Sequence, residues 1–235
     1  MGSIKPYFFE SWLLSRKKLT DKFVSFVFKP EKKIVFEAGQ YVSVKINEEG
    51  IRRPYSVVNR PGDDVIELLV DVSPDGVGVR FLLGLKEEDR VEMMGPVGRF
   101  TIGDVQEDDE IWFVGTGSGI APLRSMILDL LENRGVKNRV KLLWGMRHEK
   151  DFFWRKELVD LSEKFVNFDY KVSLSLPGKG WKGLTGRVTE YLDKVSFSGK
   201  ECFYICGGGE MVLEVRRILQ KKGIEEGRIF FERFS

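Results

Sequence analysis

Cysteine and histidine are scarce in this chain of 235 residues. Its 2 cysteines are Cys202 and Cys206, and its 1 histidine is His148. An iron–sulfur cluster of either common kind needs about four thiolates, so these cysteines are too few for a cluster or for a disulfide framework. The sequence shows neither a metal-ligand pattern nor a Ser/His/Asp nucleophilic set. We therefore expect no bound metal, and the sparing use of cysteine fits a reducing, cytoplasmic compartment.

Long apolar runs and a strong net charge are also lacking. No apolar run reaches the length of about 18 residues that a membrane-spanning helix needs. The segment Met1–Pro6 lacks the apolar core of a secretory signal, and Pro6 stands where a myristoylation signal needs Ser or Thr. The net charge of +2 does not suggest nucleic-acid binding. Basic clusters at Arg16–Lys18 and Lys221–Lys222 are interpreted as solvated surface, with a docking patch for an acidic protein as the alternative.

Up to about residue 103 the sequence has the pattern of short strands. Aromatic and β-branched residues recur there in short runs or with a period of about two. The predicted strands are Phe23–Phe28, Tyr41–Ile46, Val65–Val72 and Arg90–Met94. Turn signals such as Pro61–Asp64 separate them, and one short helix is expected at Val79–Leu85. Strands at this spacing predict a small antiparallel barrel.

From about residue 104 the sequence alternates between strand and helix patterns. The predicted strands are Glu110–Val114, Val140–Trp144, Phe168–Leu174, Cys202–Cys206 and Ile229–Glu232. The predicted helices are Leu123–Leu131 with a stop at Gly135, Trp154–Lys164, Val188–Val195 and Met211–Lys222. This alternation predicts a parallel sheet with helices on both faces. We therefore expect two domains, residues 1–103 and 104–235, joined near Phe100–Asp109.

Two glycine-rich turns each join a predicted strand to a predicted helix. In the first, Gly115–Pro122, the glycines let the backbone approach a ligand, and the free N–H groups of the helix N-terminus favour an anion such as a pyrophosphate. Its pattern is G-x-G-x-G and not the G-x-G-x-x-G dinucleotide fingerprint, so a plain turn is the alternative. The second turn, Cys206–Met211, is expected at the same carboxyl edge of the sheet, where open α/β folds bind ligands. Cys206 alone is typical of a small buried hydrophobic residue.

The tetrapeptide Arg53-Pro54-Tyr55-Ser56 places a cation, an aromatic ring and a hydroxyl group together in the barrel half. An Arg fork can hold a phosphate through two parallel hydrogen bonds. In an extended strand Tyr55 lies on the same face as Arg53, where its ring can stack on a flat ligand. Taken alone, the segment is equally typical of a half-buried strand.

In their order along the chain, these segments resemble the ferredoxin–NADP reductase-like superfamily of flavoproteins. The segments that carry the resemblance are Gly39–Tyr41, Arg53–Ser56, Gly95–Phe100, Gly115–Pro122, Trp144–Arg147, Cys206–Met211 and Phe231–Phe234. The resemblance implies an N-terminal antiparallel six-stranded β-barrel that binds flavin. It also implies a C-terminal α/β Rossmann-like parallel sheet that binds NAD(P), with a tail that returns to the flavin.

The resemblance also implies a role for each site residue. Arg53 would hold the flavin phosphate, Tyr55 would pack on the isoalloxazine, and Ser56 would hydrogen-bond near its N5. The remaining flavin-binding positions would be Pro54, Val57, Gly76, Val77, Gly78 and Val79. The nicotinamide nucleotide would be bound by Gly115, Thr116, Gly117, Gly119, Pro122, Arg147, Ser175, Cys206, Gly207, Gly208, Met211 and Phe234. The expected catalytic residues are Ser56, Cys206, Glu232 and Phe234, with Cys206 near the nicotinamide C4 and Glu232 and Phe234 near the flavin ring.

Two departures from the family pattern bear on the cofactors. Relatives often have Ser or Thr where this chain has Val79. Because valine has no hydroxyl group, one side-chain hydrogen bond to the flavin phosphate is missing. FAD is still expected, and FMN is the alternative. NADP-preferring relatives often carry Ser-Arg after the third strand of the parallel sheet, whereas this chain has Ser175-Leu176. NADH is therefore expected rather than NADPH, although Lys179 and Lys182 leave NADPH open.

The resemblance implies a reductase that passes hydride from the nicotinamide C4 to the flavin N5 and then releases electrons to an acceptor. The expected acceptor is a soluble electron-carrier protein such as a ferredoxin, a flavodoxin or a cytochrome. Because the sequence has no cysteine-rich cluster segment, an iron–sulfur or haem acceptor is expected to be a separate protein. One alternative is a reductase of free flavin, ferric chelates or another small molecule. Another is a non-catalytic flavin-binding electron-transfer subunit of a larger complex.

Overall fold

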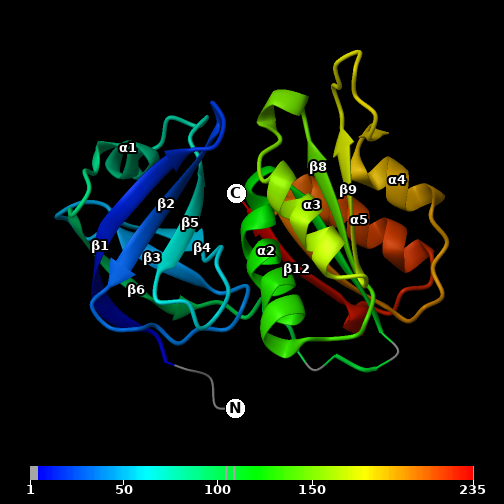
Figure 1. Cartoon of the computed structure of the whole chain (residues 1–235), viewed down its shortest axis with the longest axis horizontal. Coiled ribbons are helices and arrows are strands. Elements are labelled where there is room, and N and C mark those ends of the chain that lie inside the picture. The colour runs from blue at the N-terminus through cyan, green and yellow to red at the C-terminus, as the bar shows by residue number, and fades with distance from the viewer. Residues whose placement is uncertain (1–4, 104, 108, 235) are drawn as a thin grey trace. The chain divides into compact units, whose positions relative to one another are not determined.

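The computed structural model describes residues 5–103, 105–107 and 109–234 (Figure 1). The chain forms two compact units. Unit 1 comprises the chain through Ile102 together with Arg124–Asn133, and unit 2 comprises Gly103–Leu123 and the chain from Arg134 onward. Each unit is built on one six-stranded sheet. Among the described helices, none is long and apolar enough to cross a membrane.

The sheet of unit 1 is antiparallel. In sheet order its strands are β4 (Arg52–Ser56), β3 (Tyr41–Lys45), β6 (Arg90–Val97), β1 (Tyr7–Lys18), β2 (Phe23–Pro30) and β5 (Ile66–Asp71). Val57, which directly follows β4, forms a β-bridge with Leu68 of β5 and so joins the two edge strands. The predicted six-stranded antiparallel architecture is confirmed.

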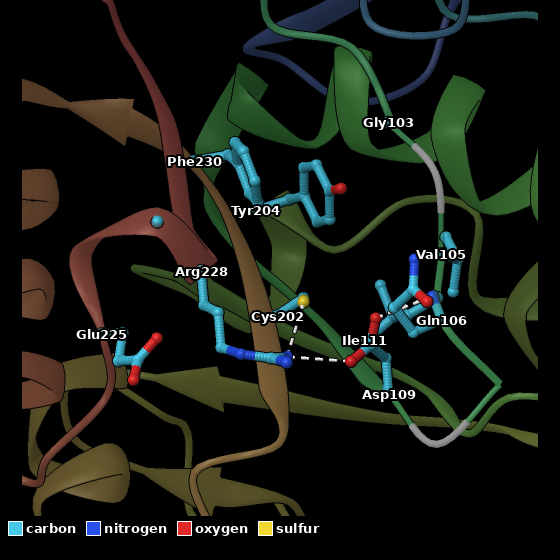
Figure 2. A pocket seen from close by; sticks show the side chains of 11 residues that line it. Gly103, Val105, Gln106, Asp109, Ile111, Cys202, Tyr204, Glu225, Arg228 and Phe230 are labelled. Atoms are coloured by element: carbon cyan, nitrogen blue, oxygen red, sulfur yellow. Dashed lines mark hydrogen bonds and ion pairs between the residues drawn. The ribbon is translucent and has the colours of Figure 1, made fainter.

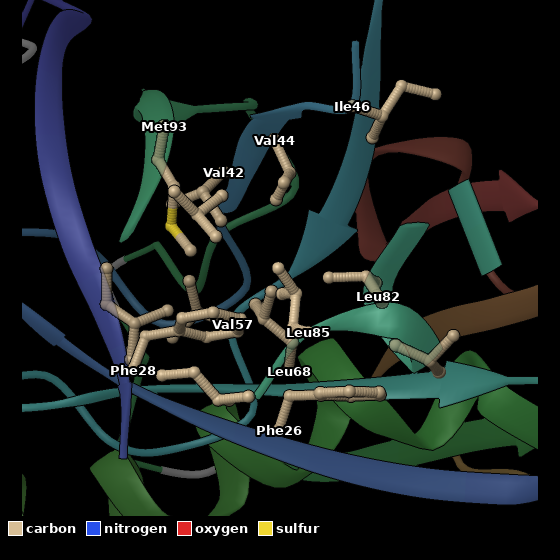
Figure 3. Packing of buried hydrophobic residues seen from close by; sticks show 14 of the residues in the cluster. Phe26, Phe28, Val42, Val44, Ile46, Val57, Leu68, Leu82, Leu85 and Met93 are labelled. Carbon is tan, nitrogen blue, oxygen red and sulfur yellow. The ribbon is translucent and has the colours of Figure 1, made fainter. Parts of the chain in front are cut away.

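The interior of unit 1 is filled by inward-facing side chains from alternate strand positions (Figure 3). Phe26 and Phe28 of β2 are fully buried there, and their rings stack with centroids 6.5 Å apart. The helix α1 (Val77–Gly84) adds Leu82, which is also fully buried. Burying a side chain of this size stabilises the fold by about 1.5–3 kcal/mol. Leu82 thus anchors α1 to the barrel and holds its first turn in place.

The strand β1 is not predicted from the sequence pattern. Phe9 and Leu13 face the core, but their sequence neighbours Phe8, Trp12 and Leu14 are exposed. Apolar residues on both faces hide the period of two on which strand prediction rests. The basic cluster at the end of β1, Arg16–Lys18, is exposed as expected.

The sheet of unit 2 is parallel throughout. In sheet order its strands are β10 (Leu184–Thr185), β9 (Phe168–Leu174), β8 (Val140–Met146), β7 (Glu110–Thr116), β11 (Glu201–Gly208) and β12 (Ile229–Phe234). The helix α2 (Ile120–Leu128) begins in unit 2 and continues as a π-helical turn at Asp129–Arg134, with Arg124–Asn133 counted in unit 1. The helices that lie wholly in unit 2 are α3 (Arg155–Lys164), α4 (Val188–Lys194) and α5 (Gly209–Lys221). Figure 1 shows α3 on one face of the sheet and α4 and α5 on the other, as predicted. The two-residue strand β10 is too short for its sequence to predict it.

The strand order of unit 2 reverses at β7. From β7 the chain adds β8, β9 and β10 on one side and then crosses to place β11 and β12 on the other. The carboxyl ends of β7 and β11 therefore flank a topological switch point, where open α/β sheets bind ligands. The helix α5, which follows β11, is fixed to the sheet by the buried side chains of Val212, Val215 and Leu219.

Candidate functional site

In unit 1, Arg53 and Tyr55 lie on one face of β4 beside the first turn of α1. A Cβ atom added to Gly78 of α1 would lie 2.6 Å from the Tyr55 hydroxyl oxygen and 3.0 Å from Cγ of Arg53. The side chain of β4 that lies between them in sequence, Pro54, is exposed. The structure thus brings together three of the residues expected to bind flavin, and a side chain at Gly78 would displace Tyr55 or Arg53.

The guanidinium group of Arg53 is available to an anion. Arg53 is exposed, and its Nη1 donates a hydrogen bond to the carbonyl oxygen of Arg52 at 2.9 Å. Within the described residues no carboxylate pairs with Arg53, whereas its neighbour Arg52 forms an ion pair with Glu92. The adjacent helix α1 begins after Gly76, which has no side chain to cap the first N–H groups. A cation beside an uncapped helix N-terminus is a suitable environment for a phosphate.

The other barrel residues of the expected site are more deeply placed. Tyr55 is half-buried, and burial raises the pKa of its hydroxyl group while the charge of Arg53 lowers it. Ser56 is buried at the end of β4. Val57 is 1% exposed, packs in the barrel core, and donates its backbone N–H to the carbonyl of Gln40 at 3.0 Å. The side chain of Val57 therefore belongs to the barrel core.

In unit 2, the two glycine-rich turns touch each other at the switch point. A Cβ atom on Gly119 would overlap the carbonyl oxygen of Cys206 and lie 2.6 Å from its carbonyl carbon. A Cβ atom on Gly207 would overlap Oγ1 of Thr116 and lie 2.5 Å from Cε of Met211. Gly115 is less restricted, because its Cβ atom would lie 2.9 Å from Cδ1 of Leu123, the end of a side chain. The close approach of the turns after β7 and β11 thus depends on residues without side chains.

The first turn also opens a helix. Gly117–Gly119 forms a 3-10 turn, Gly117 has a φ of 53° in the left-handed region, and α2 follows with Pro122 in its first turn. The expected residues Gly115, Thr116, Gly117, Gly119 and Pro122 therefore lie together, and Gly207, Gly208 and Met211 lie next to them. Such a helix N-terminus with glycines before it can receive an anion.

Arg147 and Ser175 lie on the loops after β8 and β9, and both are exposed. The two loops are tied together, because Ser175 donates its backbone N–H to Met146 at 3.0 Å and Leu176 donates to Arg147 at 2.8 Å. The side chain of Leu176 is 50% exposed. The segment in which NADP-preferring relatives often carry Ser-Arg therefore presents an apolar side chain at its surface.

Cys206 and Glu232 are opposite each other in the register of β11 and β12. The Cys206 thiol is fully buried, and burial, with a further contribution from the charge of Glu232, raises its pKa far above the ordinary range. Burial also raises the pKa of Glu232 to about 6. The thiol therefore stays protonated at neutral pH and cannot act as a thiolate nucleophile. Phe234, at the end of β12, pairs with Gly208 and is partly exposed.

A cavity of about 320 Å³ lies at the other edge of the sheet of unit 2 (Figure 2). Arg228 crosses it to bind Asp109 through Nη1 and Oδ1 at 2.8 Å, and the same nitrogen lies 3.3 Å from Sγ of Cys202. Tyr204 and Phe230 stack as its aromatic wall with ring centroids 4.9 Å apart. None of the site residues expected from the sequence lines this cavity. Across the described residues, no group of three or more His, Cys, Asp or Glu side chains could hold a metal ion.

Two residues near the switch point are absent from the expected site, although the segment Trp144–Arg147 carried the resemblance. A Cβ atom on Gly145 would lie 2.7 Å from Cγ1 of Val188 and 3.0 Å from Cγ2 of Thr116. Trp144 donates its indole N–H to the carbonyl oxygen of Gly117 at 3.1 Å. Gly145 could have been found from the sequence, because it is a glycine directly after a predicted apolar strand. No local sequence signal indicates the role of Trp144.

Family models match both halves of the chain. Residues 12–102 match the oxidoreductase FAD-binding domain, and residues 113–217 match the oxidoreductase NAD-binding domain. Because the two matches contain Arg53–Ser56 and Gly115–Pro122 respectively, they agree with the division of the site into a barrel half and a sheet half.

Curated relatives are longer than this chain. A component of the Na(+)-translocating NADH-quinone reductase of Neisseria gonorrhoeae is 32% identical over 213 residues, which cover 83% of this chain and 52% of the relative. The reductase component of phenol 2-monooxygenase from Pseudomonas sp. (strain CF600) is 33% identical over 213 residues, which cover 88% of this chain and 60% of the relative. The chain thus spans about half to three-fifths of the length of these relatives.

Solved structures share the fold. The Amycolatopsis cytochrome P450 reductase GcoB superposes with a TM-score of 0.90 at 25% identity, over 97% of this chain and 70% of the other. A ferredoxin NADP+ reductase from Neisseria gonorrhoeae, solved with bound FAD and NADP, superposes with a TM-score of 0.84 at 25% identity, over 96% and 98% of the two chains.

Proposed function

We propose that this chain, which belongs to the ferredoxin–NADP reductase-like superfamily of flavoproteins, takes electrons from NADH and passes them through FAD to a separate electron-carrier protein. Membership of this family of flavoprotein NAD(P)H reductases makes the chain an FAD- and NAD-binding oxidoreductase. Two observations in one chain carry the proposal. Arg53, whose guanidinium group is available to a phosphate, lies beside α1, and two glycine turns are in contact at a switch point. The first suits a flavin phosphate and the second suits a dinucleotide pyrophosphate.

The residues of unit 1 fit FAD. Arg53 and the N–H groups at the start of α1 would hold a phosphate, and the missing Cβ of Gly78 lets α1 pack closely against Tyr55 and Arg53. The half-buried ring of Tyr55 would pack on the isoalloxazine, and the hydroxyl of Ser56 would hydrogen-bond to it. Pro54 and the backbone of Val57 would complete this contact. When bound, FAD accepts a hydride and can release the electrons singly.

The residues of unit 2 fit a nicotinamide dinucleotide. The Gly115–Pro122 turn would bind the pyrophosphate at the start of α2, with Gly207 and Gly208 forming the other wall. Cys206 would contribute through its backbone and a neutral, uncharged thiol rather than as a nucleophile. Glu232, whose pKa burial raises to about 6, is able to hold or release a proton near neutral pH, and Phe234 would offer an aromatic face.

NADH is the proposed donor rather than NADPH. The 2′-phosphate of NADPH requires a cation, and the loop after β9 presents Leu176 at the position where relatives that prefer NADP carry Arg. Lys179 is exposed on the same loop, and Lys182 lines a cavity of about 680 Å³ with Trp181 and Arg155. These cations are the feature that would support NADPH.

A separate electron-carrier protein is the proposed acceptor. Relatives are named as the reductase component of phenol 2-monooxygenase and as the electron transfer component of toluate 1,2-dioxygenase, names that place each beside another protein. A second candidate is a role inside a larger NADH-oxidising complex, and the relative that belongs to a Na(+)-translocating NADH-quinone reductase favours it.

The test begins with purified protein reconstituted with FAD under anaerobic conditions. NADH should bleach the flavin faster than NADPH at equal concentration. The reduced protein should then transfer electrons to a ferredoxin or cytochrome faster than to free FMN or a ferric chelate. Faster transfer to the small molecules would replace the proposed acceptor with the small-molecule alternative, and a bound flavin that neither nucleotide reduces would contradict the reductase function.

A further inference from the structure

One side chain outside the expected site contacts the first glycine turn from inside the protein. Trp144 of β8 is fully buried, and its indole Nε1–H donates a hydrogen bond to the carbonyl oxygen of Gly117 at 3.1 Å. The same oxygen accepts the backbone N–H of Ile120 in the 3-10 turn. The carbonyl of Gly117 therefore has two donors, one from the turn itself and one from the sheet beneath it.

This bond holds the peptide that follows Gly117, a glycine in the left-handed region. Gly117 has a φ of 53°, a region in which glycine moves freely and other residues rarely do. In a planar trans peptide the carbonyl oxygen and the following N–H point in opposite directions. Holding the oxygen of Gly117 against the sheet therefore turns the N–H of Ser118 away from the sheet, and Ser118 is partly exposed.

The indole itself is held firmly. The rings of Phe152 and Phe153 pack edge-on against Trp144, with centroids 5.7 Å and 4.9 Å away and interplanar angles of 80° and 81°. A buried indole N–H without an acceptor would cost about 1–3 kcal/mol, so breaking the bond to Gly117 is unfavourable. The ring geometry and the buried donor together restrict the carbonyl to one orientation.

We propose that Trp144 is a positioning residue for the nucleotide pyrophosphate, acting through the orientation of the Gly117–Ser118 peptide. The proposal rests on the proposed function, because it takes the Gly115–Pro122 turn to be the pyrophosphate-binding turn. In this role Trp144 contacts no substrate and affects the binding of the nucleotide rather than the reaction that follows. It therefore contributes to nucleotide affinity and leaves the hydride-transfer step unchanged.

Trp144→Phe keeps an aromatic ring and removes the N–H donor, and Trp112→Phe is the matched control. Trp112 of β7 is also buried, and its Nε1–H donates to Glu110 at 2.6 Å instead of to the turn. ADP-ribose is the probe, because it carries the pyrophosphate without the nicotinamide. One lost hydrogen bond predicts that Trp144→Phe raises the Kd for ADP-ribose about three- to tenfold. Trp112→Phe should change it less than about twofold.

Two further measurements separate positioning from packing. In anaerobic stopped-flow mixing with NADH, Trp144→Phe should raise the apparent Kd and keep the limiting rate of flavin reduction. If Trp144→Phe lowers the melting temperature, site-specific replacement of Trp144 by 3-benzothienylalanine retains the ring shape and removes only the N–H. The isostere should then weaken ADP-ribose binding to the same extent.

Unchanged ADP-ribose affinity in the folded variant or in the isostere would overturn the positioning role while leaving the proposed function intact. An equal loss in Trp112→Phe, or a lower limiting rate with unchanged affinity, would also overturn it. Wild-type protein that binds no ADP-ribose would instead contradict the proposed function itself.

Discussion

The two halves of the candidate site provide a phosphate-binding environment in different ways. In unit 1 the contact depends on side chains, since an exposed Arg53 with no carboxylate partner in the described residues stands beside the uncapped start of α1. In unit 2 the contact depends on the absence of side chains, since Gly119 and Gly207 allow two backbone turns to touch. Both halves use a helix N-terminus, and the first adds the cation Arg53 to it.

This difference predicts how each half responds to change. A charged side chain contributes a graded electrostatic attraction, so its loss weakens binding while the backbone stays in place. A glycine in contact with a neighbouring carbonyl group leaves no room for even one methyl group, because a backbone atom cannot move aside cheaply. Substitutions in the sheet half should therefore be the more severe, and each half should lose only its own ligand.

The largest effect is expected from Gly119→Ala. Its Cβ atom would overlap the carbonyl oxygen of Cys206, so the two turns must separate. Overpacking of this kind predicts a loss of NADH affinity of about 10- to 100-fold, measured as the Kd for NADH or ADP-ribose. FAD content should remain at the wild-type level. Gly227→Ala is the control, because open space surrounds a Cβ atom there, and equal losses in the two variants would remove the role assigned to Gly119.

A smaller loss is expected from Arg53→Ala, and it should concern flavin alone. A charge-assisted hydrogen bond to an exposed phosphate predicts that FAD affinity falls about tenfold, while the Kd for ADP-ribose stays unchanged. Tyr55→Ala should also weaken FAD retention, through lost ring packing. Arg80→Ala is the control, because it removes a cation of α1 that is already paired with Asp75 at 2.8 Å. Wild-type FAD affinity in both Arg53→Ala and Tyr55→Ala would refute the flavin assignment of β4.

A modest change of preference is expected from Leu176→Arg. A cation on the exposed loop after β9 should improve the ratio of kcat/KM for NADPH to that for NADH about fivefold, since a surface ion pair contributes about 1 kcal/mol or less. Val166→Arg adds the same charge at a fully exposed position outside the expected site and is the control. A ratio that does not move in Leu176→Arg would remove the argument for NADH that rests on this residue.

The smallest effect concerns the pH dependence of stability at Glu232. Burial raises the pKa of Glu232 from 4.5 to about 6, so its contribution to stability is complete below pH 4.5 and is lost as the pH rises through 6. Glu232→Gln should therefore stabilise the protein by about 1 kcal/mol at pH 8, after allowance for partial exposure, and by less at pH 4. Melting temperatures at the two pH values measure this, with Glu214→Gln on the exposed face of α5 as the control. An equal shift at both pH values would show that ionisation is not the cause.

The halves also differ in how much of them can be predicted from the sequence. The turns Gly115–Pro122 and Cys206–Met211 follow apolar strands and open helices, so local pattern alone places them at one sheet edge. The structure adds that they touch, which depends on the order of β7 and β11 in the sheet. That order arises from the crossover of the chain and leaves no local mark.

In the barrel, the local pattern is weaker. The composition of the tetrapeptide Arg53–Ser56 does not distinguish it from an ordinary strand. Its candidate role depends on α1, which is separate from it in the sequence and next to it in space. The strand β1 is hidden for a similar reason, since exposed Phe8 and Trp12 mask its inward-facing residues. The bond from Trp144 to Gly117 is likewise a tertiary contact that neither segment shows by itself.

The most direct test uses the two halves together in one anaerobic titration. Wild-type protein reconstituted with FAD should lose its flavin absorbance on addition of NADH. Gly119→Ala should keep its flavin and require far more NADH for the same bleaching, while Arg53→Ala should bind ADP-ribose normally and bind FAD about tenfold more weakly. Flavin that stays oxidised in the wild-type protein at saturating NADH and NADPH, or loss of both ligands in each variant, would contradict a reductase built from these two binding halves.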